Sequence, residues 1–242
     1  MKRTLLIFLF SLSIFWSYQC NTLKKLGLIP SELEMALGLK DALSQGLFKG
    51  FDAFADPDGN PLVRFAFPGE AEKIEKTLRD IGFDKVMNQV TGKFTKAMSS
   101  AVAISKPLFV DAVKNMSIRD AAKILVTDNM HAATDYFKLE MKPGLMSGFR
   151  PIIDSTIKTE GADKEWSSIT NVYNKIPFIN KPLENNLSDF ISARVIDLIF
   201  VMVANEEEQI RNKYELRKTD MMKKVFTWAE KEVQKKIQNK SN

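Results

Sequence analysis

The sequence predicts an all-α fold, a single globular domain of many helices around a central buried helix at about residues 188–211. Apolar residues recur at steps of three or four along most of the chain, as one face of an amphipathic helix requires. The stretch "VIDLIFVMVA" (195–204) is instead apolar on nearly every side, which is typical of a helix that is buried all round. Because ten residues are too few to span a bilayer, we interpret this stretch as the core helix.

The first helix of the domain is expected to begin just after Pro30. Ser31 precedes Glu34 by three positions, the spacing of a capping box, in which each side chain accepts a hydrogen bond from a free amide at a helix start. The turn cluster "ADPDGNP" (55–61) is expected to end this helix. Its alternating acids resemble a calcium loop, but Phe67 stands where a bidentate carboxylate is needed, so we interpret the cluster as a turn.

The remaining segments are predicted to be helical, apart from one short β segment near residues 62–67, where "VRFAF" alternates. Pro107 is expected to interrupt the chain before another helix. Further helices are expected over about 68–81, 148–159, 163–173 and 219–237. The clearest apolar stripe of the chain consists of Phe83, Val86, Met87, Val90, Phe94, Ala97, Met98, Ala101 and Val102.

The first 19 residues are predicted to be a signal peptide. Lys2 and Arg3 precede the apolar run 5–16, which is too short for a permanent membrane span. Cys20 follows this run and is the predicted site of lipid attachment, which would anchor the chain to a membrane. A simple signal peptide or an uncleaved anchor, with Cys20 incidental, is the alternative. We therefore expect an exported protein, periplasmic or held at the membrane as a lipoprotein.

The domain organisation follows from these boundaries. We expect residues 20–30 to be a tether, residues 31–238 to form the helical domain, and residues 239–242 to be a disordered tail. About 220 residues are enough for one hydrophobic core of ordinary size.

Composition argues against several function classes. Removing residues 1–19 removes two positive charges and no acid, so the formal net charge falls from +5 to +3, and the remaining charges are mixed along the chain. This pattern does not favour a nucleic-acid partner. Cys20 is the only cysteine and His131 the only histidine, so we expect neither a disulfide nor a metal centre. The glycines lack the spacing of a phosphate-binding loop, and no cofactor is expected.

A candidate polar cluster flanks the core helix. Glu207 and Arg211 stand one helical turn apart, in the order that favours pairing, and Arg194 and Asp197 form a second possible pair. These charges either satisfy one another at the edge of the core or line a polar pocket. The candidate cluster, to which no catalytic role is assigned, consists of Arg194, Asp197, Glu207, Arg211, Asp111, Arg119 and Tyr136.

Four segments resemble a known family. "KPLFVDAVKNMSIRDAAKIL" (106–125) and "AATDYF" (132–137) are followed by "FVMVANEEEQIRN" (200–212) and "TDMMKKVF" (219–226). In this order they resemble the bacterial family named domain of unknown function 4197, over about residues 31–226. The resemblance implies an exported helical protein, and it implies no reaction.

The functional expectation is an exported, non-catalytic interaction or scaffold module at the bacterial envelope, whose partner is another envelope protein. One alternative is a carrier of an apolar ligand held between helices, because the chain has 11 methionines and 17 phenylalanines. The other is an envelope hydrolase with a carboxylate site, although the sequence shows no motif for a nucleophile or a metal.

Overall fold

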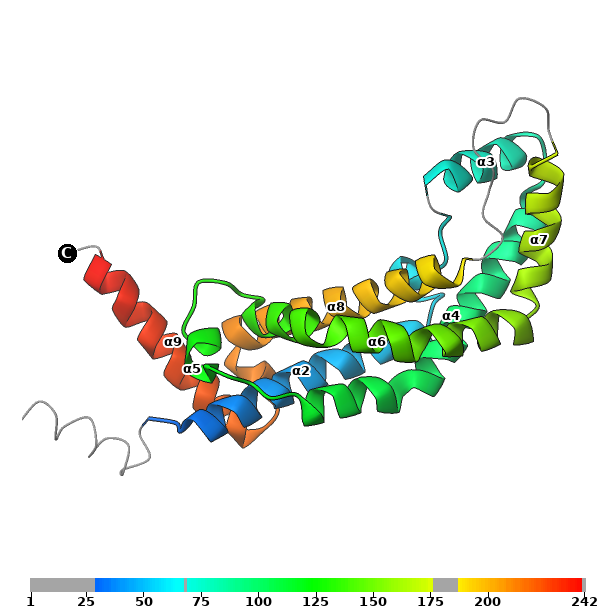
Figure 1. Cartoon of the computed structure of the whole chain (residues 1–242). Helices are drawn as coiled ribbons and strands as arrows, with labels where there is room; N and C mark the ends of the chain where they lie inside the picture. The colour runs from blue at the N-terminus through cyan, green and yellow to red at the C-terminus, as the bar shows by residue number, and fades with distance from the viewer. Residues whose placement is uncertain (1–28, 68, 176–186, 241–242) are drawn as a thin grey trace, which may run out of the picture. The chain divides into compact units, whose positions relative to one another are not determined.

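The computed structural model describes residues 29–67, 69–175 and 187–240. In these ranges the chain forms eight α-helices and two short 3₁₀ turns, and no strand, so the predicted all-α fold is confirmed (Figure 1). The elements are α2 (Glu32–Ala55), η1 (Pro61–Val63), α3 (Gly69–Asp80), α4 (Asp84–Asn115), α5 (Ala121–Leu125), α6 (Ala132–Thr159), α7 (Ala162–Tyr173), α8 (Ser188–Asn212), η2 (Tyr214–Leu216) and α9 (Asp220–Lys240).

Several predictions fall on residues that the structure does not describe. These are the signal peptide over residues 1–19, Cys20 with most of the tether, and the end of the predicted tail. Helix α9 extends through Lys240, two residues into the stretch 239–242 that was expected to be disordered. In the described part of the chain, no helix combines the length and the apolar character needed to cross a bilayer.

The predicted capping box opens α2. The backbone N–H of Ser31 donates to Oε2 of Glu34 at 2.8 Å, and the N–H of Glu34 donates to Oγ of Ser31 at 3.3 Å. These reciprocal bonds satisfy amides that have no partner inside the helix. At the other end, the N–H of Gly59 donates to Oδ1 of Asp56 at 3.0 Å, so this acid closes the expected turn.

The chain divides into two compact units. Unit 1 contains the described residues up to Ala42, the segment 118–132 and the C-terminal segment from Gln209. Unit 2 contains residues 43–117 and 133–208. Helices α2 and α8 each contribute one end to unit 1 and the rest to unit 2.

Unit 1 packs α9 against the start of α2 and against the short helix α5. An ideal Cβ placed on Gly38 would overlap the side chain of Val225, so the backbone of α2 approaches α9 closely. The amphipathic stripe of α9 faces inward, and its buried members are Met222, Val225, Phe226 and Ala229. This burial is why a helix with so many charged residues remains attached to the unit.

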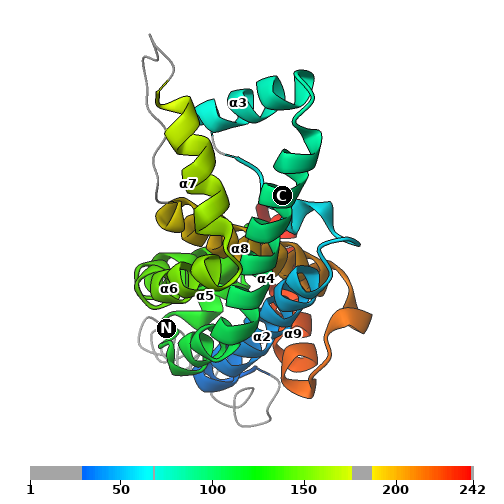
Figure 2. The same cartoon turned by 90° about the vertical axis from the view of Figure 1, so that its right-hand side faces the viewer.

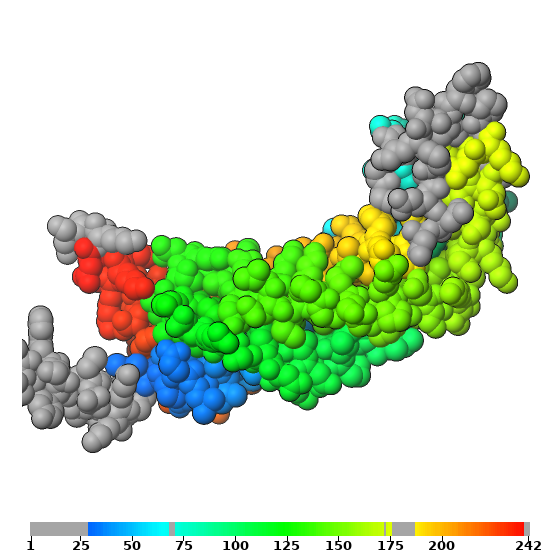
Figure 3. Space-filling view, in the orientation of Figure 1, coloured from blue at the N-terminus to red at the C-terminus, as the bar shows by residue number. Residues whose placement is uncertain are grey.

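In unit 2, α2 and α8 approach closely where α2 carries glycine. A Cβ on Gly46 would lie 2.8 Å from Cα of Val203, a distance that real side chains do not reach. On another side of the core, Phe109 of α4 contacts both Phe51 of α2 and Phe149 of α6, with 6.0 Å between ring centroids in each pair. The second half of α4 therefore runs beside α6 (Figures 1 and 2), and the outer face of α6 belongs to the surface of the unit (Figure 3).

The first half of α4 supports α3 and α7, as Figure 2 shows. The loop before α3 adds Phe65, which stacks on Phe94 of α4 at 4.5 Å, and Phe67, which stacks on Trp166 of α7 at 5.2 Å. These four rings fix the loop, α4 and α7 to one another.

The expected β segment near 62–67 is wrong. Val63, Phe65 and Phe67 are buried and the residues between them are exposed, so the alternation in the sequence is real. However, the N–H of Phe65 donates to Oγ1 of Thr95 at 3.0 Å, and no strand lies beside this segment in the described structure. Burial of every second residue against aromatic rings, and not membership of a β-sheet, explains the alternation in this segment.

The expected interruption at Pro107 is also wrong, because α4 continues through it, and α6 contains both Pro143 and Pro151. Each proline leaves the carbonyl four residues earlier without its usual donor. All three prolines are exposed, so those carbonyls face solvent. Burial of Phe109 and Phe149 on the opposite faces holds the helices together across these positions.

Candidate functional site

Glu207 of the predicted cluster binds the start of α6. Its Oε1 accepts a hydrogen bond from the N–H of Ala133 at 3.0 Å, and its Oε2 accepts from the N–H of Thr134 at 2.8 Å. The hydroxyl of Thr134 donates to the same Oε2 at 2.7 Å. Glu207 is 1% exposed, and its charge lies at the positive end of the α6 dipole. This carboxylate is therefore a helix cap contributed by another helix.

Asp197 lies between two lysines of α6. Its Oδ1 is 2.7 Å from Nζ of Lys142 and 3.2 Å from Nζ of Lys138. Partial burial alone would raise the pKa of Asp197, but the hydrogen bonds from Lys142 and Lys138 outweigh it and lower the pKa below its ordinary value. The predicted partner Arg194 is exposed. The carboxylate of Asp197 is thus held ionised between α6 and α8.

Arg211 binds the end of α5 within unit 1. Its guanidinium donates to the carbonyls of Ile124 and Leu125 at 2.9 and 3.0 Å and lies over the ring of Phe226. A cation at the carboxyl end of a helix complements the helix dipole. Glu207 and Arg211 belong to different units, so their mutual pairing stays a prediction.

The remaining members of the cluster, Asp111, Arg119 and Tyr136, take no part in these contacts. Asp111 and Arg119 are exposed, and the hydroxyl of Tyr136 donates to the carbonyl of Ser117 at 2.8 Å. The structure therefore uses these predicted residues for separate contacts within each unit, mostly at helix ends.

Sequence reasoning missed Arg217, the largest fully buried side chain of the described residues. Its guanidinium donates to the carbonyls of Ile210 and Arg211, to the hydroxyl of Thr227 and to Glu230, at 2.9 to 3.2 Å. These bonds tie η2 to both α8 and α9. Arg217 follows a short polar loop without a periodic pattern, so the sequence held no signal for its burial.

An apolar depression lies between α3, α4 and α7, and we call it the apolar hollow. It is lined by Ile74, Leu78, Phe83, Val86, Met87, Glu165, Ser168, Ile169 and Tyr173, and its volume is about 270 Å³. Phe83 is 49% exposed and Val86 is 42% exposed. Both belong to the apolar stripe identified in the sequence, whose other seven members are buried. The start of the stripe is therefore apolar surface.

A charged rim adjoins the apolar hollow. Glu165 lines it and accepts a hydrogen bond from Nζ of Lys93 at 2.7 Å, with both side chains about one third exposed. An apolar centre with a charged edge is the usual anatomy of a protein interface.

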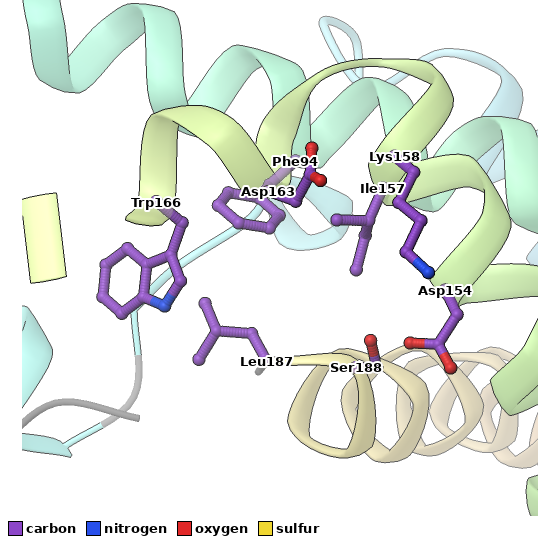
Figure 4. Close-up of a pocket in the computed structure, with 8 residues that line it drawn as sticks. All are labelled: Phe94, Asp154, Ile157, Lys158, Asp163, Trp166, Leu187 and Ser188. Atoms are coloured by element: carbon purple, nitrogen blue, oxygen red, sulfur yellow. The ribbon is translucent and has the colours of Figure 1, made fainter. Parts of the chain in front are cut away.

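A second cavity of about 280 Å³, shown in Figure 4, is more mixed in character. Trp166 and Leu187 lie on one side of it, and the polar ends of Asp154, Lys158 and Ser188 lie on the other. Its apolar wall belongs to the aromatic core formed by Phe94 and Trp166. We therefore regard it as a gap at the edge of the core of unit 2, and the apolar hollow as the candidate functional site.

Comparison with protein families supports the resemblance that the sequence suggested. The family model described as "Protein of unknown function (DUF4197)" matches residues 30–227. The chain belongs to this family. The DUF4197 match includes the whole lining of the apolar hollow, the caps made by Glu207 and Arg211, and the buried Arg217. Comparisons with curated proteins and with solved structures gave no match.

Proposed function

We propose that this DUF4197 protein is an exported, non-catalytic interaction module of the bacterial envelope that holds a partner protein through the apolar hollow. The main support is the exposure of Phe83 and Val86 beside apolar walls. Apolar side chains gathered at a depression typically mark a binding surface, whereas scattered exposed ones need no explanation.

The carboxylates near the core helix argue against the hydrolase alternative. A general acid needs a raised pKa, but the lysines beside Asp197 lower its pKa. Glu207 uses both oxygens to bind the backbone and hydroxyl donors at the start of α6. Neither group is arranged to transfer a proton to a substrate, so binding is the better-supported activity.

The size and rim of the apolar hollow favour a partner protein. A hollow of about 270 Å³ suits one or two large side chains, and interface hot spots are often single side chains inserted in such depressions. The Lys93–Glu165 pair would then pair with polar groups of the partner around that anchor.

The second candidate is an apolar ligand such as a fatty acyl chain. The aliphatic side chains of Ile74, Leu78 and Ile169 favour it, because a flexible hydrocarbon chain fits between them without polar contacts. The occupant would then be a lipid, and the protein a carrier.

Export and anchoring rest on the sequence of the first 20 residues. Cell fractionation and mass spectrometry of the N-terminal peptide test them. We expect a chain that begins at Cys20 with a mass increase from acylation. Intact chain beginning at Met1 and free in the cytosol would contradict the export proposal.

Photo-crosslinking in living cells tests which occupant the apolar hollow binds. The photoreactive residue p-benzoylphenylalanine is placed at Val86 and, as the matched control, at Val201, a helical valine of unit 2 that is 48% exposed and does not line the hollow. We expect a discrete protein adduct at position 86 and none at position 201. A lipid adduct at position 86 would favour the carrier instead, and equal labelling at both positions would contradict both proposals.

A further inference from the structure

The turn that joins α3 to α4 carries apolar side chains into solvent. Residues 80–86 are all exposed, and within this run Ile81 is 64% exposed and Phe83 is 49% exposed. The chain reverses through Gly82, whose φ of +94° favours glycine, and a Cβ placed there would meet no atom within 4 Å. Figures 1 and 2 show this turn at the end of α3, away from α6. The turn is therefore an apolar projection of unit 2.

The apolar hollow begins directly beside this projection. Leu78 and Phe83, which stand on either side of Ile81 in the chain, both line the hollow. The backbone N–H of Phe83 donates to the carbonyl of Leu78 at 2.9 Å, which fixes these two walls to the turn. One surface of unit 2 therefore carries both a projecting apolar side chain and a cavity that suits such a side chain. The copies in a two-fold symmetric dimer use the same patch, so that patch has to carry both features.

Two charges beside the turn have no partner among the described residues. Asp80 is the last residue of α3 and Lys85 lies in the first turn of α4, and no described side chain or backbone group bonds to either. Each charge also lies at the helix end that disfavours it, because the carboxyl end of a helix repels an acid and the amino end repels a base. The helices themselves therefore do not explain either charge.

This pair of charges matches a second copy of the same patch. A two-fold axis through the turn brings the acid of one copy toward the base of the other, so an acid and a base on one patch are self-complementary. An acyl chain, the alternative occupant of the hollow, would need neither charge. The charges thus favour the same partner as the projection and the cavity.

We propose that the apolar hollow binds a second copy of this chain. In this two-fold dimer Ile81 of each copy enters the hollow of the other, and Asp80 of each copy pairs with Lys85 of the other. The inference rests on the proposed function, because it uses the same hollow, and it names the partner protein. Attachment of both copies to one membrane would raise their local concentration, so a small interface would be sufficient.

Photo-crosslinking between two tagged copies tests the identity of the partner. Full-length chains with two different tags are expressed together, and one of them carries p-benzoylphenylalanine at Ile81. The matched control carries it at Ile104, an isoleucine of α4 that is 60% exposed and does not line the hollow. We expect position 81 to give an adduct of twice the chain mass that contains both tags, and position 104 to give none.

An exchange of charges tests the two-fold geometry. In a dimer of identical variants, Asp80→Lys or Lys85→Asp places like charges opposite each other, and we expect either change to reduce the yield of the two-tag adduct at least about threefold. When one copy carries Asp80→Lys and the other carries Lys85→Asp, both contacts again join opposite charges. We expect this mixed pair to return to within about 1.5-fold of the wild-type yield. Each substitution also improves the charge at its helix end, so a loss of folding would not explain a lower yield.

Three results would overturn the dimer. The first is the absence of a two-tag adduct at position 81 while position 86 is crosslinked to a different protein, which would leave the proposed function intact. The second is an equal yield of the two-tag adduct at positions 81 and 104, which would indicate random collision. The third is a mixed pair of charge variants whose yield stays as low as that of the single variants. The absence of any protein adduct at positions 81 and 86 would contradict both the dimer and the proposed function.

Discussion

Glu207 of α8 and Thr134 of α6 are joined by two hydrogen bonds to one oxygen. Oε2 of Glu207 accepts from the backbone N–H of Thr134 at 2.8 Å and from its hydroxyl at 2.7 Å. These residues are 73 positions apart in the chain, so the contact fixes the start of one long helix on the side of another.

Replacing Glu207 with alanine should therefore destabilise the protein strongly. The change leaves the amides of Ala133 and Thr134 buried without an acceptor, and we expect a loss of about 3 kcal/mol in the free energy of unfolding. Glu207→Gln keeps one acceptor oxygen and should lose less. Urea denaturation measures both variants, and a loss below about 1 kcal/mol for Glu207→Ala would show that the cap is unimportant.

Replacing Arg217 should destabilise the protein about as strongly as replacing Glu207, for a different reason. Arg217→Met leaves the carbonyls of Ile210 and Arg211 without their donor in a buried position, and we expect a loss of about 3 kcal/mol. Arg217→Lys should not restore this stability, because a single ammonium cannot reproduce the planar fork of the guanidinium. The exposed Arg119→Met is the control, with an expected change below about 0.5 kcal/mol.

We predict opposite effects on stability when one methyl group is added at each of two helical glycines. Gly46→Ala should destabilise the protein, because its Cβ would lie 2.8 Å from the backbone of Val203. Gly92→Ala should stabilise it by about 0.5–1 kcal/mol, because its Cβ enters open space and alanine favours the helix. Thermal unfolding of the two variants measures the contrast, and a shift of the same sign in both would contradict the close approach of α2 and α8.

The capping box predicts a pH dependence in unit 1. The hydrogen bond from Lys224, followed by that from the backbone of Ser31, lowers the pKa of Glu34 from 4.5 to about 2. A lowered carboxyl pKa stabilises the folded state above the unfolded value of 4.5, and this contribution is lost as the pH falls toward about 2.

The difference in melting temperature between the wild type and Glu34→Gln should therefore be largest at neutral pH and shrink between pH 4.5 and 2. Glu32→Gln, in the same first turn, is the control. A difference that stays constant down to pH 2 would show that the ionised carboxylate of Glu34 contributes nothing to stability.

The sequence was sufficient to predict local structure wherever the cause is local. The pair Ser31 and Glu34 located the start of α2, because a capping box needs only residues three apart. The same reasoning failed at Pro107, because packing of Phe109 on the opposite face outweighs one missing hydrogen bond. It also mistook the alternation at residues 62–67 for a strand, since rings from α4 and α7 bury the same positions.

The roles of the charged residues were harder to predict. The sequence suggests pairs one helical turn apart, whereas Asp197 contacts Lys142 and Glu207 contacts Thr134, residues more than 50 positions away. Neighbours in the sequence carry no signal for such contacts. The sequence likewise did not indicate that the start of the α4 stripe is exposed. Phe83 and Val86 continue the same period as the buried Met87 and Val90.

The most direct test of the central proposal compares Val86→Glu with Val201→Glu. Each variant adds a charge at a half-exposed helical valine of unit 2, but only the first adds it at the apolar hollow. The measurement is the amount of the crosslinked envelope partner that co-isolates with each variant, by quantitative mass spectrometry after membrane solubilisation. We predict that Val86→Glu reduces this amount at least about tenfold and that Val201→Glu leaves it within about twofold. Equal recovery with both variants would contradict binding through the apolar hollow.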